Sequence, residues 1–299
     1  MKRYRTILIV LCGLCMISCA KQESGGAGDN SAEFFSLLSS DNDDYQPHKV
    51  NEALKGDYKN YEKFFEGTDY EIGISSSKDG ALPGGSRISC ISGKSQIRKA
   101  IATKSSIDGL PPIKSFVDGV EISQENIRAT TKSSTGIMDC FGKVVKFTFG
   151  NDNGTRASGE GMGEADMYVP AAIEFLFPRA ETEEDLNPLC YYKNFVIRWN
   201  KDENNANGVL VVIDWTGSMV LGNDIADTQV CRIATFPDTG EALLSEEMFD
   251  GIPDTALCDM MILRGNVENV EQGGYSYKLL GKTHQQISFI LIRELEYQQ

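Results

Sequence analysis

Alternation between apolar and polar residues constrains the fold of this chain more than any other feature of its sequence. From about Tyr70 onward, apolar residues recur at every second position, which is typical of β-strands with one buried face. Few segments show the longer period of an amphipathic helix, so the pattern predicts an all-β fold. The clearest early strands lie at residues 143–149, with Val145, Phe147 and Phe149 on one face, and at residues 172–177, with Ile173, Phe175 and Phe177 on one face.

The second half of the chain contains the clearest predicted hairpin. A polar loop, residues 202–208, would join its two strands and ends in Asn-Gly. Because Trp199 and Trp215 continue the apolar faces of these strands, we expect both to pack in the core. The faces consist of Phe195, Ile197 and Trp199 in one strand and Val209, Val211, Ile213 and Trp215 in the other. Further strands are expected at residues 230–234, 260–263, 275–280 and 287–292, and short helical candidates at 49–65 and 243–249.

The first residues have the organisation of an export signal. Lys2, Arg3 and Arg5 precede an uncharged, mostly apolar run at residues 6–18, which is shorter than the roughly 20 residues of a membrane-spanning helix. The run ends in Met-Ile-Ser-Cys, which resembles the lipobox of bacterial lipoproteins. This resemblance implies cleavage before Cys19 and attachment of a lipid to its sulfur.

Residues 20–48 are rich in small and charged residues and are expected to form a flexible tether. Its first residues, Ala-Lys-Gln-Glu after Cys19, partly resemble the export signal of Bacteroidota-type surface lipoproteins, although Gln22 departs from that signal. The resemblance implies an outer membrane lipoprotein, with display at the cell surface favoured over the periplasmic face.

An acidic run at residues 181–185, bracketed by Pro178 and Pro188, is the best candidate for a domain boundary. We therefore predict two antiparallel β-sandwich domains, Ig-like or transthyretin-like, after a lipidated tether. The expected segments are a signal peptide at 1–18, the tether at 19–48, an N-terminal domain at 49–180 and a C-terminal domain at 186–299. This organisation resembles the Bacteroidota-type cell-surface lipoproteins with tandem β-sandwich domains, whose functions are largely unassigned.

The charge of the chain excludes one class of partner. Without the leader, 26 basic side chains face 43 acidic ones, a net charge of −17. Nucleic acid is bound chiefly through Lys and Arg, so no nucleic-acid partner is expected. Anionic headgroups are repelled as well, which leaves the lipid on Cys19 as the expected contact with the membrane.

Five cysteines follow the anchor: Cys90, Cys140, Cys190, Cys231 and Cys258. Their odd number leaves at least one thiol unpaired within the chain, and their wide spacing excludes a zinc site of the C-x-x-C kind. Either buried free thiols or one or two disulfides would fit. No metal and no cofactor are expected.

Several residues are candidates for contacts with a ligand or for modification. Tyr191 and Tyr192, and Tyr275 with Tyr277, would form a platform for a sugar if they lie on an exposed surface. Asp-Thr-Ala at residues 254–256 matches a tripeptide that Bacteroidota-type organisms use for O-glycosylation, which would place a glycan on Thr255.

Two segments rich in oxygen-bearing side chains partly match known metal-binding motifs, but each lacks a required part of its motif. Residues 211–219 resemble the metal-adhesion start of a von Willebrand A domain, but the 80 residues that follow lack the strand and helix pairs of that fold. Residues 201–208 lack the spacing of a calcium loop, because Ala206 stands where a ligand is needed. We interpret the first as a strand ending in a polar turn and the second as a solvated loop.

No catalytic motif is evident. The sequence contains two histidines, His48 beside the tether and His284 in an expected polar turn, and none of the common hydrolase or phosphate-binding motifs. The leading hypothesis is a non-catalytic binding or adhesion protein whose ligand is a glycan or a protein. The alternatives are a structural subunit that resembles fimbrillins and a glycan-cleaving enzyme that uses two carboxylates.

The lipobox generates the first prediction. Replacing Cys19 with Ala removes the sulfur that would carry the lipid, so the variant should stay unacylated and unprocessed or mislocalised. Metabolic labelling with a fatty acid measures this directly. Label retained on the Cys19→Ala protein would contradict the lipoprotein assignment.

Overall fold

The computed structural model describes residues 51–52, 68–79, 99–106, 109–122, 127–130, 136–150, 161–178, 187–219 and 229–294. Almost all regular elements in these ranges are β-strands, which confirms the all-β prediction. Within them, the helical elements are two short 3-10 turns, η2 (Ile137–Cys140) and η3 (Glu246–Phe249), and no helix is long and apolar enough to cross a membrane. The leader, Cys19, the tether and Cys90 lie outside the described residues.

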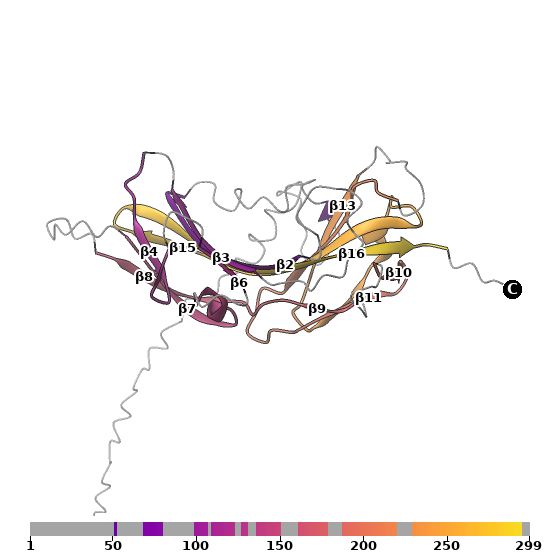
Figure 1. Cartoon of the computed structure of the whole chain (residues 1–299), viewed down its shortest axis with the longest axis horizontal. Coiled ribbons are helices and arrows are strands. Elements are labelled where there is room, and N and C mark those ends of the chain that lie inside the picture. The colour runs from indigo at the N-terminus through magenta and orange to yellow at the C-terminus, as the bar shows by residue number, and fades with distance from the viewer. Residues whose placement is uncertain are drawn as a thin grey trace, which may run out of the picture.

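The largest sheet has nine strands, and eight of them follow the order β1-β13-β12-β15-β16-β2-β3-β6 (Figure 1). All pairs along this order are antiparallel except β16 and β2, which are parallel. The ninth strand, β10 (Leu189–Tyr191), also pairs with β16 in parallel. The bounds of the eight strands are β1 (Asn51–Glu52), β2 (Tyr70–Asp79), β3 (Lys99–Ser106), β6 (Ile127–Thr130), β12 (Val209–Trp215), β13 (Val230–Phe236), β15 (Ala256–Gln272) and β16 (Tyr275–Ile292).

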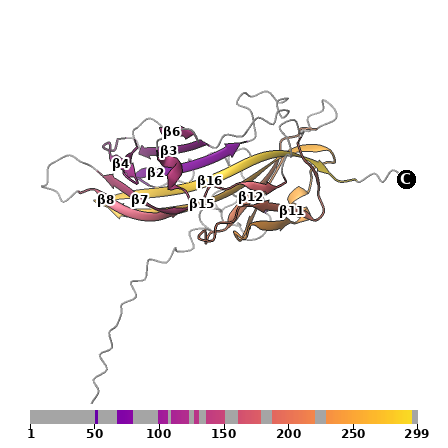
Figure 2. The ribbon, with the colours of Figure 1, turned by 60° about the horizontal axis from the view of Figure 1, so that its bottom comes forward.

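Two smaller sheets pack against the same face of the large sheet. Tyr277 and Leu279 of β16 contact one of them and Phe289 and Leu291 contact the other, and all four side chains leave β16 on one face because they are separated by even numbers of residues. The four-stranded sheet underlies one half of the large sheet and the three-stranded sheet the other half (Figures 1 and 2). Their strands are β5 (Val120–Glu121), β4 (Lys114–Val117), β7 (Lys143–Gly150) and β8 (Gly163–Val169) in the first, and β14 (Glu241–Leu244), β11 (Phe195–Trp199) and β9 (Phe175–Phe177) in the second.

Each small sheet encloses its own hydrophobic core with the large sheet. The core under the four-stranded sheet contains Phe147, Phe149 and Val169, and the core under the three-stranded sheet contains Trp199 and Trp215. Both tryptophans are thus buried, as the sequence predicted. The division into domains at 49–180 and 186–299 is not confirmed, because β2 and β3 share the large sheet with β12, β13, β15 and β16.

The predicted hairpin between residues 195–199 and 209–215 is wrong. β11 pairs with β14 and β9, whereas β12 pairs with β13 and β15. The two strands therefore lie in different sheets, and their apolar faces meet across the core instead of lying side by side. Sequence alternation shows which residues of a strand are buried, but two strands that face each other carry the same alternation as two that are paired.

β16 is one continuous strand where the sequence predicted two strands and a polar turn. Residues 282–285 pair with β15 on one side and β2 on the other. Two of these polar side chains bond a segment that is distant in the sequence. Thr283 Oγ1 accepts the N–H of Ile173 at 3.1 Å, and Gln285 Oε1 accepts that of Phe175 at 2.7 Å. The polar side chains thus satisfy the backbone of the segment that connects β8 to β9.

Two smaller expectations also need correction. Phe177 is 48% exposed instead of sharing a buried face with Phe175, because the pairing of β11 and β9 shifts register at Arg198 and Trp199. The helical candidate at 243–249 divides between the end of β14 and η3. Of the candidate at 49–65, the structure describes only residues 51–52, which form β1.

Gly281 generates a prediction about the packing of β16 against β8. A Cβ at this position would lie 2.9 Å from Val169 Cγ2 and 3.1 Å from Val169 Cγ1, both too close for a stiff valine side chain. Gly281→Ala should therefore lower the free energy of unfolding by about 1–3 kcal/mol, measured by chemical denaturation. In a Val169→Ala background the same change should cost little or be stabilising. Equal costs in both backgrounds would show that this contact does not limit the packing.

Candidate functional site

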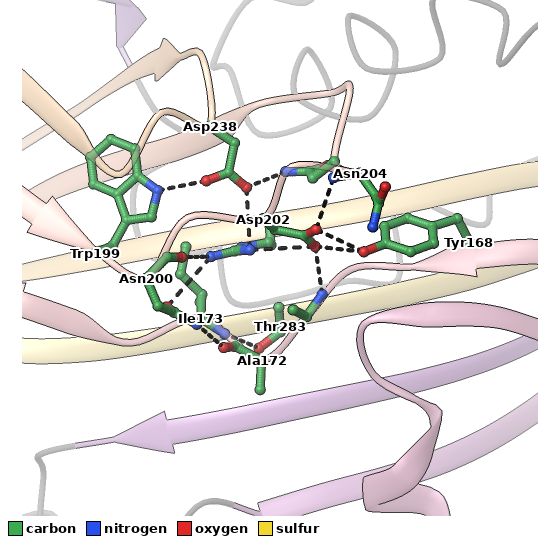
Figure 3. Close-up of polar contacts among 12 residues, drawn as sticks. Tyr168, Ala172, Ile173, Trp199, Asn200, Asp202, Asn204, Asp238 and Thr283 are labelled. Atoms are coloured by element: carbon green, nitrogen blue, oxygen red, sulfur yellow. Dashed lines mark hydrogen bonds and ion pairs between the residues drawn. The ribbon is translucent and has the colours of Figure 1, made fainter.

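A buried arginine, Arg264, lies between the carboxylates of Asp202 and Asp238 at the junction of the two cores. Figure 3 shows these two carboxylates with Tyr168 and Trp199, to which they are hydrogen-bonded. Arg264 is on the core face of β15, and its side chain is fully buried. Its Nη1 lies 3.2 Å from Asp238 Oδ2 and 3.5 Å from Asp202 Oδ2, and its Nη2 donates to the carbonyl oxygen of Asn200. One cation thus lies between two carboxylates that come from different loops.

Hydrogen bonds from three sides hold Asp202. Its carboxylate accepts the Tyr168 hydroxyl at 2.7 Å, the Ala171 N–H at 2.8 Å and the Asn204 N–H at 3.1 Å. Burial alone would raise the pKa of Asp202, but these bonds and the charge of Arg264 lower it below its ordinary value. The stability that the ionised carboxylate contributes is therefore present above about pH 4 and is lost as the pH falls through the lowered pKa.

Asp238 is held from the other side. Its Oδ1 accepts the indole N–H of Trp199 at 2.7 Å, and its Oδ2 accepts the side-chain amide of Asn205 at 2.9 Å. Asn205 also donates to the carbonyl of Gly208 at 2.7 Å. The prediction of a solvated loop at residues 201–208 is therefore only partly right. Lys201, Glu203, Asn204 and Ala206 are exposed, but Asp202 and Asn205 point inward and are only 6% and 7% exposed.

This network has a structural role in the described molecule. It joins β8, the loop between β11 and β12, the turn after β13 and the middle of β15. Arg264 Nη1 contributes through its charge, since neither it nor Nε makes a hydrogen bond to the described residues. Burial lowers the pKa of Arg264, while Asp238 and Asp202 oppose that shift. Because the guanidinium is fully covered, it offers no surface to a ligand.

The structure separates the four candidate tyrosines into two pairs at opposite ends of β16. Tyr277 pairs with the start of β2, whereas Tyr191 pairs with Ile292, which is roughly 50 Å further along the strand. Tyr277 is 3% exposed, because it stacks on Tyr70 with 5.1 Å between the ring centroids and packs against Phe149 at 4.4 Å. The expectation that Tyr277 contacts a ligand is therefore wrong, since it is a core residue. Tyr275 is half-buried with its ring edge-on to that of Tyr70.

The other pair forms an accessible group with two cations, which we call the Tyr192 cluster: Tyr191, Tyr192, Lys193 and Arg293. The two tyrosine rings are half-buried and meet edge to face, with centroids 5.3 Å apart. Arg293 Cζ lies 4.7 Å and Lys193 Nζ 5.3 Å from the centroid of the Tyr192 ring. These distances are typical of cation–π contacts.

Backbone groups fix the Tyr192 cluster to the end of the sheet. Tyr192 N–H donates to the carbonyl of Ile292 at 3.1 Å, and its ring packs against the adjacent core. Arg293 Nε donates to the carbonyl of Ile252 at 2.6 Å, and its Nη2 donates to that of Phe249. The cluster is therefore preorganised by β10, η3 and the end of β16.

Thr255 lies close to this end of the molecule. The carboxylate of Asp254 accepts the backbone N–H of Arg293, so the turn that carries Thr255 is tied to the cluster. Thr255 is half-buried, has φ of 56° and donates its hydroxyl to the carbonyl of Asp254 at 2.7 Å. O-glycosylation of Thr255 stays a prediction.

The remaining candidates have structural surroundings. β12 is antiparallel to both of its neighbours, unlike the parallel strand that the adhesion motif at residues 211–219 requires. Of the five mature cysteines, the four in the described residues are buried and form no disulfide, and burial raises the pKa of Cys140 to about 11 and of Cys190 to about 12. Such thiols are poor nucleophiles. No group of three His, Cys, Asp or Glu side chains in the described ranges is arranged to hold a metal ion.

Sequence reasoning found the tyrosines of the cluster but missed both cations. Lys193 follows Tyr192 directly, so its proximity was readable from the sequence. Arg293 is about 100 positions away and is brought close only by the pairing of β10 with β16. No family model, curated protein or solved structure matches this chain, so the function is inferred from the geometry.

The network predicts that substitution of Arg264 lowers the stability of the fold strongly. Arg264→Met would leave Asp202 and Asp238 buried without a counter-charge, so the free energy of unfolding should fall by about 3–5 kcal/mol. Arg198→Met is the matched control, because Arg198 forms an ion pair with Glu241 on the surface and should contribute at most about 1 kcal/mol. Urea denaturation measures both. Similar losses in the two variants would show that the network is not essential to the junction.

Proposed function

We propose that the mature chain is a lipid-anchored, non-catalytic binding protein of the outer membrane, displayed at the cell surface, which contacts a glycan or protein through the Tyr192 cluster. One observation carries the proposal: two adjacent tyrosine rings lie half-exposed at the end of the large sheet, fixed by β10 and β16. Of the four tyrosines considered as contacts, this pair is the one on the same surface as two cations.

Rigid aromatic rings suit binding at low entropic cost. A tyrosine offers a flat apolar face and a hydroxyl, and it loses little side-chain freedom when the protein has already fixed its ring. Strand pairing and a backbone hydrogen bond hold the main chain of Tyr191 and Tyr192. The Tyr192 ring packs against the core, and the Tyr191 ring packs edge to face against Tyr192. The apolar face of a sugar ring, or an aromatic or proline side chain of a protein, fits such a surface.

The lipobox and charge support the location. A diacylglycerol on Cys19 would hold the chain at a membrane, while a net charge of −17 would keep the folded part away from anionic headgroups. The folded part would then be free to turn its binding surface toward a partner.

The proposal is tested with detergent-solubilised mature protein on an array of glycans and on cell-surface proteins. Tyr191→Ala removes one ring of the pair without touching the core, and binding should weaken about five- to tenfold, which corresponds to about 1–1.4 kcal/mol. Tyr275→Ala is the matched control, because it removes a half-buried tyrosine at the other end of β16 and should leave binding unchanged. Thermal unfolding of both variants confirms that they fold. Binding by Tyr191→Ala at wild-type affinity would overturn the proposal.

A further inference from the structure

Several basic side chains in the described part of the chain are paired with a carboxylate. Six of them form ion pairs within 4.0 Å: Lys78, Lys143, Lys146, Arg198, Lys201 and Arg264. This is expected in a chain with 43 acidic and 29 basic residues, where a carboxylate is seldom far away. A cation without such a partner is therefore informative.

Lys193 and Arg293 are two accessible cations of the described residues that make no ion pair, and both lie against the same Tyr192 ring. Lys104 and Lys278 make none either, but the first donates to the carbonyl of Ile113 and the second is buried. Two positive charges thus gather at the aromatic pair of an otherwise acidic protein.

Among the described residues, the groups that bind the guanidinium of Arg293 are neutral. Its Nε and Nη2 donate to backbone carbonyls, and its Nη1 donates to none of the described residues. Asp254 also contacts Arg293, but its carboxylate accepts the backbone N–H groups of Arg293 and Glu294 and not an N–H of the guanidinium. The positive charge of Arg293 is therefore oriented but not neutralised.

Lys193 is fully exposed, and a hydrogen bond with the Tyr192 hydroxyl raises its pKa, with smaller contributions from Tyr191 and Glu246. It is therefore charged at neutral pH. Its Nζ can move without disturbing the fold, because no part of the core depends on it.

We infer that the Tyr192 cluster binds an anionic saccharide, with the sugar ring against the tyrosines and its carboxylate or sulfate between Lys193 and Arg293. This inference rests on the proposed binding function and names the chemistry of its ligand. The tyrosine rings would contact the ring of the sugar, and the two cations would bind its negatively charged substituent.

The charge of the whole chain limits the size of this ligand. A long polyanion would experience the net charge of −17 over a surface wider than the Debye length of about 8 Å, whereas a short acidic saccharide would experience mainly the two cations. The cluster therefore recognises a single acidic sugar or the end of a chain in preference to the middle of a polyanion.

The test compares saccharides that differ only in charge. Calorimetry with the mature protein at 0.15 M salt would use trigalacturonic acid against its methyl ester, and sulfated lactose against lactose. The acid should bind at least tenfold more tightly than the ester, and Lys193→Met should remove most of that difference, so that the acid and the ester bind with similar affinity. Lys193→Arg should retain the preference. Lys201→Met is the matched control, since it removes an exposed lysine that is paired with Glu203.

The outcomes separate this inference from the proposed function. Preference for trigalacturonic acid alone assigns a carboxylate, and preference for sulfated lactose alone assigns a sulfate; both support the inference. Equal binding of charged and neutral members, unchanged by Lys193→Met, would overturn the anionic ligand and leave a neutral glycan site that still depends on Tyr191. Failure of the wild-type protein to bind any of the four, together with no effect of Tyr191→Ala on the glycan array, would overturn both.

Discussion

The pairing of β15 with β16 is the constraint on which the rest of the structure depends. All 17 residues of β15 pair with β16 without interruption. Side chains of both strands lie in the core under the three-stranded sheet, and β16 contributes Tyr277 and Leu279 to the other core, against which Val270 of β15 packs. A hairpin of this length would bury little alone. It becomes stable because one small sheet covers each half of its inner face, so that two cores of ordinary size share one continuous backbone ladder.

Covering one long sheet with two short ones creates a problem at their junction. The chain must cross between layers there, and each crossing carries backbone groups that cannot pair within a sheet. At this junction the charged side chains Arg264 and Asp202 bond backbone groups and, with Asp238, form ion pairs. The neutral side chains of Thr283 and Gln285 also bond backbone groups there. Buried charges are costly unless fully bonded, which explains why the carboxylates accept several hydrogen bonds each.

Several strands were readable from the sequence, because alternation reports burial directly. Val145, Phe147 and Phe149 are all buried, as are Trp199 and Trp215. The assignment of strands to sheets was not readable, since alternation is the same for β11 and β12 whether they pair or face each other. The length of β16 was missed for another physical reason: its polar residues bond a distant backbone segment, and no local pattern distinguishes that role from a turn.

The parallel pairing of β2 with β16 has a consequence for how the chain is made. Asp69 and Ser276, which are hydrogen-bonded at the start of this pair, are separated by 207 positions. Loops of this length close slowly, and neither core can be completed before β16 has left the ribosome or the translocation channel. Until then the edge of β2 has no partner, and unpaired strand edges invite aggregation. A chain of this topology therefore completes its folding only when its final long strand arrives.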